Sequence, residues 1–298
     1  MRALLTCALL LAWSAPALGG GRITVGLYAP SAPFDSPSDR LQYVTRLADH
    51  LEPAAGGAEV VGRVFARASD FVAALRRGEL QFAVIDAPYA AARGLPYRAL
   101  AAATRGGAAE AAWLLVTGAG MSGLSDLRGR TLAVARTGAR EAAFVSNVLL
   151  EGEVDAASYF GGITLTPDSL SAATLVKLGR ADAALVPAGV AIPDGLRVVG
   201  RTRPVGWPMF VALPGAAEGT VAAFANRVAS FGDGALPGMA AVTRTDYAAL
   251  RAAFGRAPKR PVMPSPRPAR LSARDLLPGR VFEIAPIDPL DLVSPASP

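Results

Sequence analysis

Predominantly apolar runs alternate with amphipathic segments at the start of the chain. Three of these runs have the length of buried strands, at residues 23–27, 59–65 and 82–85. A helix is expected over residues 38–52, with an apolar face formed by Leu41, Val44, Leu47, Ala48 and Leu51. A second helix is expected from Ser69 to Gly78. This alternation predicts a mostly parallel sheet with helices on both faces.

The segment from residue 124 to residue 140 predicts an anion-binding geometry. A buried strand over residues 131–134 leads into a small polar loop, and a helix is expected to begin near Ala139. Such a helix start leaves backbone N–H groups unpaired and adds partial positive charge. Thr137 or Gly138 would cap the helix, and Arg136 and Arg140 add formal charge. An ordinary strand–turn–helix with two solvated arginines remains the alternative.

Two segments of the chain repeat one αβ pattern. In residues 69–86 and again in residues 171–187, a helix ends at a glycine, Gly78 or Gly179, and a buried strand follows after a short turn. We therefore expect two α/β lobes of similar build. Apolar crossovers at residues 113–117 and 204–213 would join them, and helices over residues 216–231 and 245–254 would pack back on the first lobe.

These crossovers set the expected domain boundaries. Lobe 1 comprises residues 21–117 plus 205–255, and lobe 2 comprises residues 118–204. Two crossovers between two lobes predict a hinged cleft that closes around a ligand.

The two ends of the chain differ from the rest. Residues 1–20 have the features of a signal peptide: Arg2, an apolar stretch over residues 4–13, and small residues at Ala15 and Ala17. We therefore expect an exported, periplasmic protein. Residues 256–298 are rich in proline and are expected to form an extended, disordered tail.

Composition argues against several functional classes. The net charge of +6 is scattered along the chain without a basic stripe, so nucleic acid is not an expected partner. The chain has no nucleophile elbow, no His-x-x-x-His pair and no P-loop. Its single histidine is His50, and its single cysteine, Cys7, lies in the signal segment. No metal, no cofactor and no catalytic activity are expected.

Five segments together resemble the type II periplasmic solute-binding proteins, and among them the phosphate, phosphite and phosphonate binders of ABC transporters. They include Ile-Thr-Val-Gly-Leu-Tyr at 23–28 and Phe-Ala-Val-Ile-Asp-Ala-Pro-Tyr at 82–89. The other three are residues 41–51, 124–134 and 175–184, and the resemblance spans residues 22 to 255. It implies a two-lobed α/β fold of the type II periplasmic-binding-protein kind, each lobe a mostly parallel sheet flanked by helices, with a hinged cleft between them.

The resemblance also implies where a ligand lies. Tyr28 and Ser31 would face the cleft, Tyr89 matches an aromatic that contacts ligand, and Thr137 with Gly138 match the helix start that cradles oxyanion oxygens. Two motifs depart from the family pattern. Ala-Arg-Thr-Gly-Ala at 135–139 replaces a serine-rich run, and Asp-Ser-Leu at 168–170 replaces a Ser-His pair. The candidate ligand-binding residues are Tyr28, Ser31, Asp86, Tyr89, Arg136, Thr137, Gly138, Ala139, Arg140 and Ser169.

These observations predict a monomeric, exported solute-binding protein. It would capture a small oxyanion or a phosphonate-like ligand with backbone N–H groups and hydroxyls and deliver it to an ABC permease. Two alternatives remain open. One is a ligand-sensing or scaffold protein that partners a membrane sensor kinase, and the other is an enzyme, such as a dehydratase, on the same fold.

Overall fold

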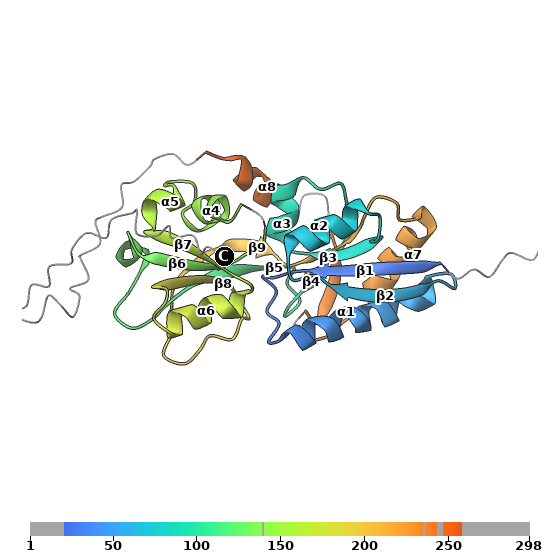
Figure 1. The fold of residues 1–298 in the computed structure, drawn as a ribbon, viewed down its shortest axis with the longest axis horizontal. Coiled ribbons are helices and arrows are strands. Elements are labelled where there is room, and N and C mark those ends of the chain that lie inside the picture. Colours follow the sequence, from blue (N-terminus) through green and yellow to red (C-terminus); the bar gives the residue numbers. More distant parts are fainter. Residues whose placement is uncertain (1–20, 139, 235, 243–246, 258–298) are drawn as a thin grey trace, which may run out of the picture. The chain divides into compact units, whose positions relative to one another are not determined.

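Two β-sheets with helices on their faces make up the fold (Figure 1). The structure is a computed structural model that describes residues 21–138, 140–234, 236–242 and 247–257. The expected signal peptide and all but the first two residues of the expected tail lie outside these ranges.

The first sheet has six strands in the order β11-β4-β10-β3-β1-β2. Their bounds are β1 Arg22–Tyr28, β2 Glu59–Val64, β3 Phe82–Ile85, β4 Arg98–Thr104, β10 Met209–Ala212 and β11 Gly238–Ala241. The central strand β3 is fully buried, as its run of apolar residues requires.

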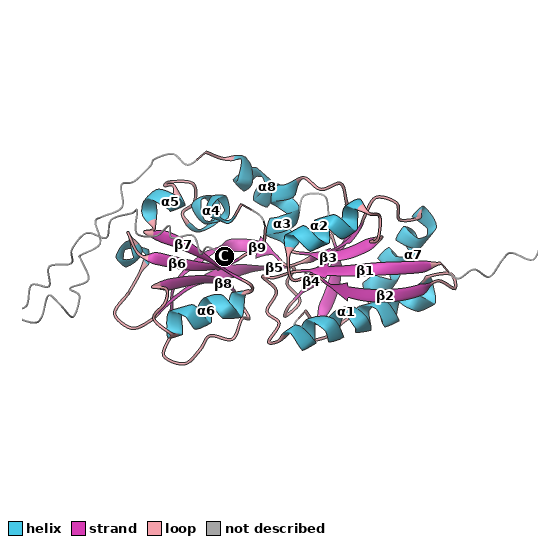
Figure 2. Cartoon of the chain, in the orientation of Figure 1, coloured by secondary structure: helices cyan, strands magenta, loops and turns pink. Residues whose placement is uncertain are grey.

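The second sheet has five strands in the order β7-β6-β8-β5-β9 (Figure 2). Their bounds are β5 Glu110–Thr117, β6 Thr131–Ala135, β7 Gly162–Thr166, β8 Ala183–Pro187 and β9 Arg197–Gly206. The two outermost strands, β7 and β9, carry the more exposed burial patterns.

Both sheets are mixed, which corrects the expectation of mostly parallel sheets. The pairs β1·β2, β1·β3, β6·β7 and β6·β8 are parallel, and the pairs that involve β4, β5, β10 or β11 are antiparallel. The parallel pairs β1·β2, β1·β3, β6·β7 and β6·β8 are each separated along the chain by at least one helix, as a parallel pair requires a long crossover.

The strand pairing also shifts one expected boundary. Residues 113–117 were assigned to the first lobe, but they belong to β5, whose partners are β8 and β9 of the second sheet. The expected return over residues 204–213 is two strands. Trp207 and Pro208 separate β9 from β10, and these two strands lie in different sheets.

The helices cover the sheets. Their bounds are α1 Pro37–Leu51, α2 Ala68–Arg76, α3 Ala87–Arg93, α4 Glu141–Phe144, α5 Ala156–Tyr159, α6 Ser169–Lys177, α7 Glu218–Val228 and α8 Ala248–Gly255. Short 3₁₀ segments lie at Glu52–Ala54 and Leu124–Leu127, and Val145–Leu149 continues α4 as a π-helix.

Helix α1 shows how local sequence sets an element's limits and its buried face. The Ser36 hydroxyl accepts the Asp39 N–H, and Pro37 takes the first helical position, where a missing N–H costs nothing. The buried face includes Tyr43 and four of the five expected residues, but Leu41 is 53% exposed. The expectation for Leu41 was therefore wrong. The buried stripe of α1 includes Tyr43 and leaves Leu41 exposed.

The repeated αβ pattern is confirmed as two units of the same local build. Helices α2 and α6 each end two residues before a glycine with positive φ, Gly78 at 68° and Gly179 at 65°. The buried strands β3 and β8 follow. The left-handed backbone conformation that follows each helix favours glycine at both positions.

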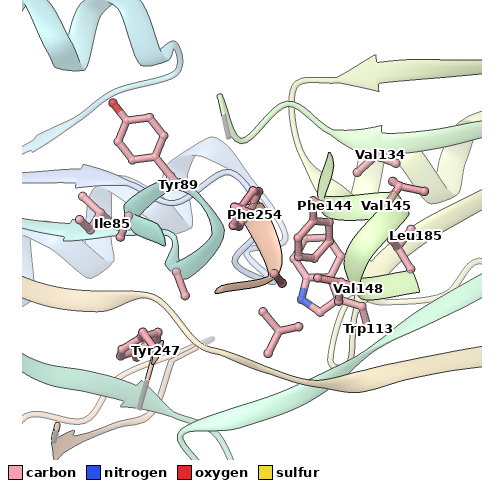
Figure 3. Close-up of a cluster of buried hydrophobic side chains, with 14 of the residues drawn as sticks. Ile85, Tyr89, Trp113, Val134, Phe144, Val145, Val148, Leu185, Tyr247 and Phe254 are labelled. Atoms are coloured by element: carbon pink, nitrogen blue, oxygen red, sulfur yellow. The ribbon is translucent and has the colours of Figure 1, made fainter. Parts of the chain in front are cut away.

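One apolar cluster includes residues from both sheets (Figure 3). Trp113 of β5 packs on Phe144 at 4.8 Å between ring centroids, and Phe144 stacks on Phe254 of α8 at 6.2 Å. Helix α8 thus contributes a buried aromatic to this cluster, close to where a returning helix was expected.

Candidate functional site

A cavity of about 740 Å³ is lined by elements of both sheets. The first sheet contributes Tyr28 from the end of β1, residues 66–69 around the start of α2, and Arg93 from the end of α3. The second contributes the loop after β6 and the end of β7. The complete lining is Tyr28, Ala66, Arg67, Ala68, Ser69, Arg93, Arg136, Gly138, Arg140, Glu141, Leu165 and Pro167.

Positive charge dominates this lining. It contains four arginines, Arg67, Arg93, Arg136 and Arg140, against one carboxylate, Glu141. In the described part of the chain, none of these four arginines forms a salt bridge. Guanidinium groups present several N–H donors in a planar fork that matches oxyanion geometry. The cavity is therefore suited to an anion.

Backbone geometry at the loop after β6 brings this charge to the cavity. Gly138 has a φ of 74° and Arg140 a φ of 54°, both in the left-handed region. Helix α4 consequently begins at Glu141, two residues later than the expected start near Ala139, since left-handed residues cannot continue a right-handed helix. Ala139 itself lies outside the described residues.

Glu141 already occupies the expected anion position at this loop. Its Oε1 accepts the Gly138 N–H at 2.7 Å and lies 3.5 Å from the Thr137 hydroxyl, which donates to it. Glu141 is the first residue of α4, and its side chain reaches back past Arg140 to accept an N–H of the loop that precedes the helix. The Thr137 side chain is buried, and its backbone N–H donates to Ala135 O.

Tyr28 and Tyr89 pack against each other beside Gly138. Their ring centroids are 4.9 Å apart in a T-shaped arrangement. The Tyr28 hydroxyl donates to Thr137 O at 3.0 Å and to Arg136 O at 3.4 Å, so it holds the loop after β6. Burial is the main cause of its raised pKa. Tyr28 therefore stays a neutral donor.

Tyr89 has a buried hydroxyl without a hydrogen-bond partner among the described residues. Figure 3 shows this hydroxyl at the end of the ring that points away from the other labelled side chains. Arg93 lies over the ring at 6.0 Å and its Nε donates to Gly138 O at 2.8 Å. Burial also raises the pKa of Tyr89.

The remaining candidates gather in a second, buried network. Asp86 is fully buried at the end of β3, and its carboxylate accepts the Ser31 N–H at 2.8 Å and the Ser31 hydroxyl at 2.7 Å. The Ser169 hydroxyl, at the start of α6, donates to Ser31 O at 3.3 Å. Ser31, Asp86 and Ser169 thus link the loop after β1 and the end of β3 to the start of α6. None of the three lines the 740 Å³ cavity.

Electrostatics in this network depend on burial. Desolvation raises the pKa of Asp86 from 3.8 to about 6, against the opposing effects of the Ser31 hydrogen bonds and the charge of Arg40. Arg40 donates to Ala29 O at 3.4 Å and lies 4.0 Å from Asp168. Burial in turn lowers the pKa of Arg40.

The sequence analysis assigned ten candidates to one site, and the structure separates the nine of them that it describes into three groups. Tyr28, Arg136, Gly138 and Arg140 line the cavity, Tyr89 and Thr137 pack behind it, and Ser31, Asp86 and Ser169 form the buried network. Eight lining residues were missed: Ala66, Arg67, Ala68, Ser69, Arg93, Glu141, Leu165 and Pro167. A signal for Glu141 was its place next to the expected helix start, where an acidic side chain complements the helix dipole. Arg67 and Arg93 had no local signal, because the tertiary structure alone brings them to the cavity.

Other kinds of site have less support. Among the described residues, no group of three or more His, Cys, Asp or Glu side chains is placed to hold a metal ion. No helix in these ranges combines the length and apolar character needed to cross a membrane.

Comparison with known proteins identifies the fold class and then the family. XAC2383 from Xanthomonas citri, determined bound to ATP, is 20% identical and has a TM-score of 0.61, with 79% of this chain and 98% of that chain covered. PhnD1 from Prochlorococcus marinus, determined with methylphosphonate, is 14% identical with a TM-score of 0.61, covering 80% and 98%. A binding-protein component of an ABC phosphonate transporter from Pseudomonas aeruginosa is 12% identical with a TM-score of 0.59, covering 78% and 85%. The fold is that of the two-lobed periplasmic binding proteins, as expected.

The family follows from the sequence match. A family model described as "ABC transporter, phosphonate, periplasmic substrate-binding protein" matches residues 31–256, and the chain belongs to this family. Its members are substrate-binding components of transporters and not enzymes, and the family implies a permease partner and a small anionic ligand. No curated protein matches the sequence.

Proposed function

We propose that the protein is exported to the periplasm, where it binds a small oxyanion or a phosphonate-like anion in the cleft between its lobes and delivers it to an ABC permease. The observation that carries this proposal is the 740 Å³ cavity with four arginines and one glutamate in its lining. Its volume lies within the range of ordinary small-molecule sites, about 300–1,000 Å³. Family membership supports the transport role.

The arginine side chains, and not the Gly138 N–H, are the proposed contacts to the anion. Glu141 takes the Gly138 N–H, and its negative charge repels an anion at that point. Arg67 and Arg136 are exposed and line the cavity. Helix α2 begins at Ala68 in the lining of the same cavity, and no side chain caps it. Its dipole therefore adds positive potential there.

Titration calorimetry with methylphosphonate, inorganic phosphate and sulfate tests the proposal. Each guanidinium contact to an oxyanion is a charge-assisted hydrogen bond of about 1.5–3 kcal/mol. Arg136→Gln is therefore expected to weaken binding about 10- to 100-fold. Arg201→Gln, which removes an exposed arginine of β9 outside the cavity, is the matched control and should bind as the wild type does.

Two results would contradict the proposal. One is the absence of binding to all three anions by the folded wild-type protein. The other is an equal loss of affinity in Arg136→Gln and Arg201→Gln, because net charge and not the cavity would then govern binding.

Export and assembly have separate tests. We expect the mature N-terminus, determined by mass spectrometry on protein from the periplasm, to begin close to residue 20. Light scattering should give the mass of a monomer. A precursor retained with residues 1–20 intact would contradict the export proposal.

A further inference from the structure

Side chains from elements of the first sheet donate hydrogen bonds to the loop after β6, which belongs to the second sheet. The Tyr28 hydroxyl, at the end of β1, donates to Thr137 O at 3.0 Å and to Arg136 O at 3.4 Å. The Arg93 Nε, at the end of α3, donates to Gly138 O at 2.8 Å. Three consecutive carbonyl oxygens of this loop thus accept hydrogen bonds from two side chains of the other lobe.

Another hydrogen bond crosses between the lobes in the opposite direction. The Ser169 hydroxyl, at the start of α6 in the second lobe, donates to Ser31 O in the first at 3.3 Å. Both of these serines are buried. We call the bonds donated by Tyr28, Arg93 and Ser169 the interlobe bonds. Because each lobe contributes both donors and acceptors, these bonds join the lobes at two places.

Backbone and side chains are packed closely where the lobes meet. A Cβ on Gly138 would lie 2.8 Å from the Ala68 Cβ and 3.4 Å from Cε2 of Tyr89. Ala68 belongs to α2 and Tyr89 to α3, two helices that follow strands of the first sheet. Non-bonded carbon atoms pack at about 3.5–4.0 Å, so no further atom fits between Gly138 and Ala68. The lobes therefore contact each other directly at this point.

The interlobe bonds take the part that an anion plays in a cleft that closes around a ligand. A hydroxyl and a guanidinium that face such a cleft would donate to the oxygens of an anion. In this protein, carbonyl oxygens of the other lobe accept from them. After exchange with water, one such bond shifts an equilibrium by about 2- to 12-fold. Three donors together shift it toward contact between the lobes by about 10- to 1,000-fold.

From these contacts we propose that the two lobes close on each other without a ligand, held by the interlobe bonds. The donors of each lobe find their acceptors in the other lobe, so closure requires no group from outside the chain. Closure of the lobes then does not depend on whether the 740 Å³ cavity is occupied. This inference goes beyond the proposed function and holds for any ligand of that cavity.

The distance between two spin labels, measured without added ligand, tests the closed form. Asp70→Cys on α2 and Thr164→Cys on β7 provide exposed sites for the labels. Their neighbours Ser69 and Leu165 line the 740 Å³ cavity from the two lobes, so opening would lengthen the distance. The only native cysteine, Cys7, lies in the expected signal peptide, so the mature protein carries only these two. We expect one distance distribution, centred on the separation in the structure and unchanged by methylphosphonate.

Removing all three donors tests what holds the lobes together. The triple variant is Tyr28→Phe, Arg93→Met and Ser169→Ala, which keeps the Tyr28 ring packed on Tyr89 at 4.9 Å. In the labelled protein, we expect it to increase the ratio of open to closed molecules by about 10-fold or more. A second population at longer distance should therefore appear. Thermal melting verifies that the variant folds.

A matched triple variant removes the same kinds of donor from bonds within one lobe. It consists of Tyr159→Phe, Thr174→Ala and Arg197→Met. The first two hydroxyls donate to Leu124 O at 2.6 Å and to Leu170 O at 2.9 Å, and Arg197 donates to Met121 O. All of these donors and acceptors belong to the second lobe, so this variant should keep the distance distribution of the wild type.

Two results would overturn the inference. One is a wild-type protein whose labels, without added ligand, lie mainly at a longer distance than in the structure. The other is the same distribution in both triple variants, because contacts other than the interlobe bonds would then hold the lobes together. Since these distances are measured without ligand, they do not depend on whether the proposed anion binding holds.

Discussion

Helices α2 and α6 occupy equivalent places in the two repeated αβ units but begin differently. At the start of α6, the Asp168 carboxylate accepts the Ser171 N–H at 2.7 Å. At the start of α2, Arg67 holds the same position and makes no side-chain cap. The start of α6 is thus capped by the Asp168 carboxylate, and the start of α2 lines the arginine-rich cavity.

This difference indicates how one local pattern serves two purposes. A capped helix start gains stability because an unpaired N–H finds an acceptor within the chain. An uncapped start with a cation forgoes that gain and keeps its positive potential for an anion from outside. The two αβ units thus share one local structure, and the residue before each helix distinguishes them. Asp168 caps α6 within the chain, whereas Arg67 leaves the start of α2 open to a ligand.

The largest expected effect comes from closing the space at the α2 start. A Cβ on Gly138 would lie 2.8 Å from the Ala68 Cβ and 3.3 Å from the Tyr28 hydroxyl. Gly138→Val is therefore expected to abolish anion binding. It should also destabilise the fold by more than the roughly 1–2 kcal/mol that a left-handed backbone costs a non-glycine residue. Calorimetry and urea denaturation measure the two effects.

Gly78→Val provides the control for backbone strain. Gly78 has a similar φ of 68° but has no atom within 4 Å of an added Cβ. Equal destabilisation by the two substitutions would show that the close approach of Ala68 and Gly138 has no energetic role.

The second comparison concerns the ends of strands β3 and β8, where Asp86 and Pro187 occupy similar positions. Only Asp86 carries a group that can titrate. Burial raises the pKa of Asp86 from 3.8 to about 6, so the folded state binds its proton more tightly than the unfolded state does. Stability contributed by the protonated group is therefore lost as pH rises from about 4 to about 6. A shift of this size corresponds to about 3 kcal/mol.

Asp86→Asn removes this titration. The unfolding free energy of the wild type, minus that of the variant, should fall by about 2 kcal/mol between pH 4 and pH 7. Urea denaturation at several pH values measures it. Parallel pH profiles for the two proteins would mean that Asp86 has an ordinary pKa in the folded state.

Removing the cap of α6 should have a smaller effect. Asp168→Ala is expected to lower the unfolding free energy by about 1 kcal/mol, the usual value of an N-cap. Asp194→Ala removes an exposed aspartate from the loop after β8 and should change stability by less than about 0.5 kcal/mol. If the two variants melt at the same temperature, the Asp168 cap contributes nothing measurable.

The smallest stability change is expected when α2 receives the cap that α6 has. Arg67→Asp should raise the unfolding free energy by about 0.5–1 kcal/mol, through the cap and the helix dipole. The same change should weaken anion binding by about 10-fold or more, since one guanidinium is lost and a carboxylate is added. Urea denaturation and calorimetry together measure these opposite effects.

Arg76→Asp serves as the control for net charge. It makes the same charge change at the other end of α2, outside the cavity. Anion affinity that falls equally in both variants would contradict a specific role for the start of α2.

Much of the fold was predictable because local patterns dominate it. The apolar run of β3 and the helical stripe of α1 identify these elements, and the glycines after α2 and α6 set their ends. The family resemblance predicted two lobes, and both the structure and the family match support this. Strand β4 was not predicted, since its alanine-rich sequence, Arg98–Thr104, lacks the alternation and β-branched residues typical of a strand.

The sheet directions and the site depended on the tertiary structure. Short connections between strands do not reveal which sheet receives the next strand, and β5 was for this reason assigned to the wrong side of the boundary. The loop after β6 was identified from sequence as a place of positive charge, and it does line the cavity.

What the sequence by itself determined was many of the elements and the family, because both arise from patterns between residues near one another along the chain. Only the tertiary structure brought Arg67 and Arg93 to the loop after β6 and separated Ser31, Asp86 and Ser169 from the cavity. It also placed the Glu141 carboxylate at the Gly138 N–H. The electrostatic potential of a site is the sum of charges that lie close in space, and distance along the chain does not specify that sum.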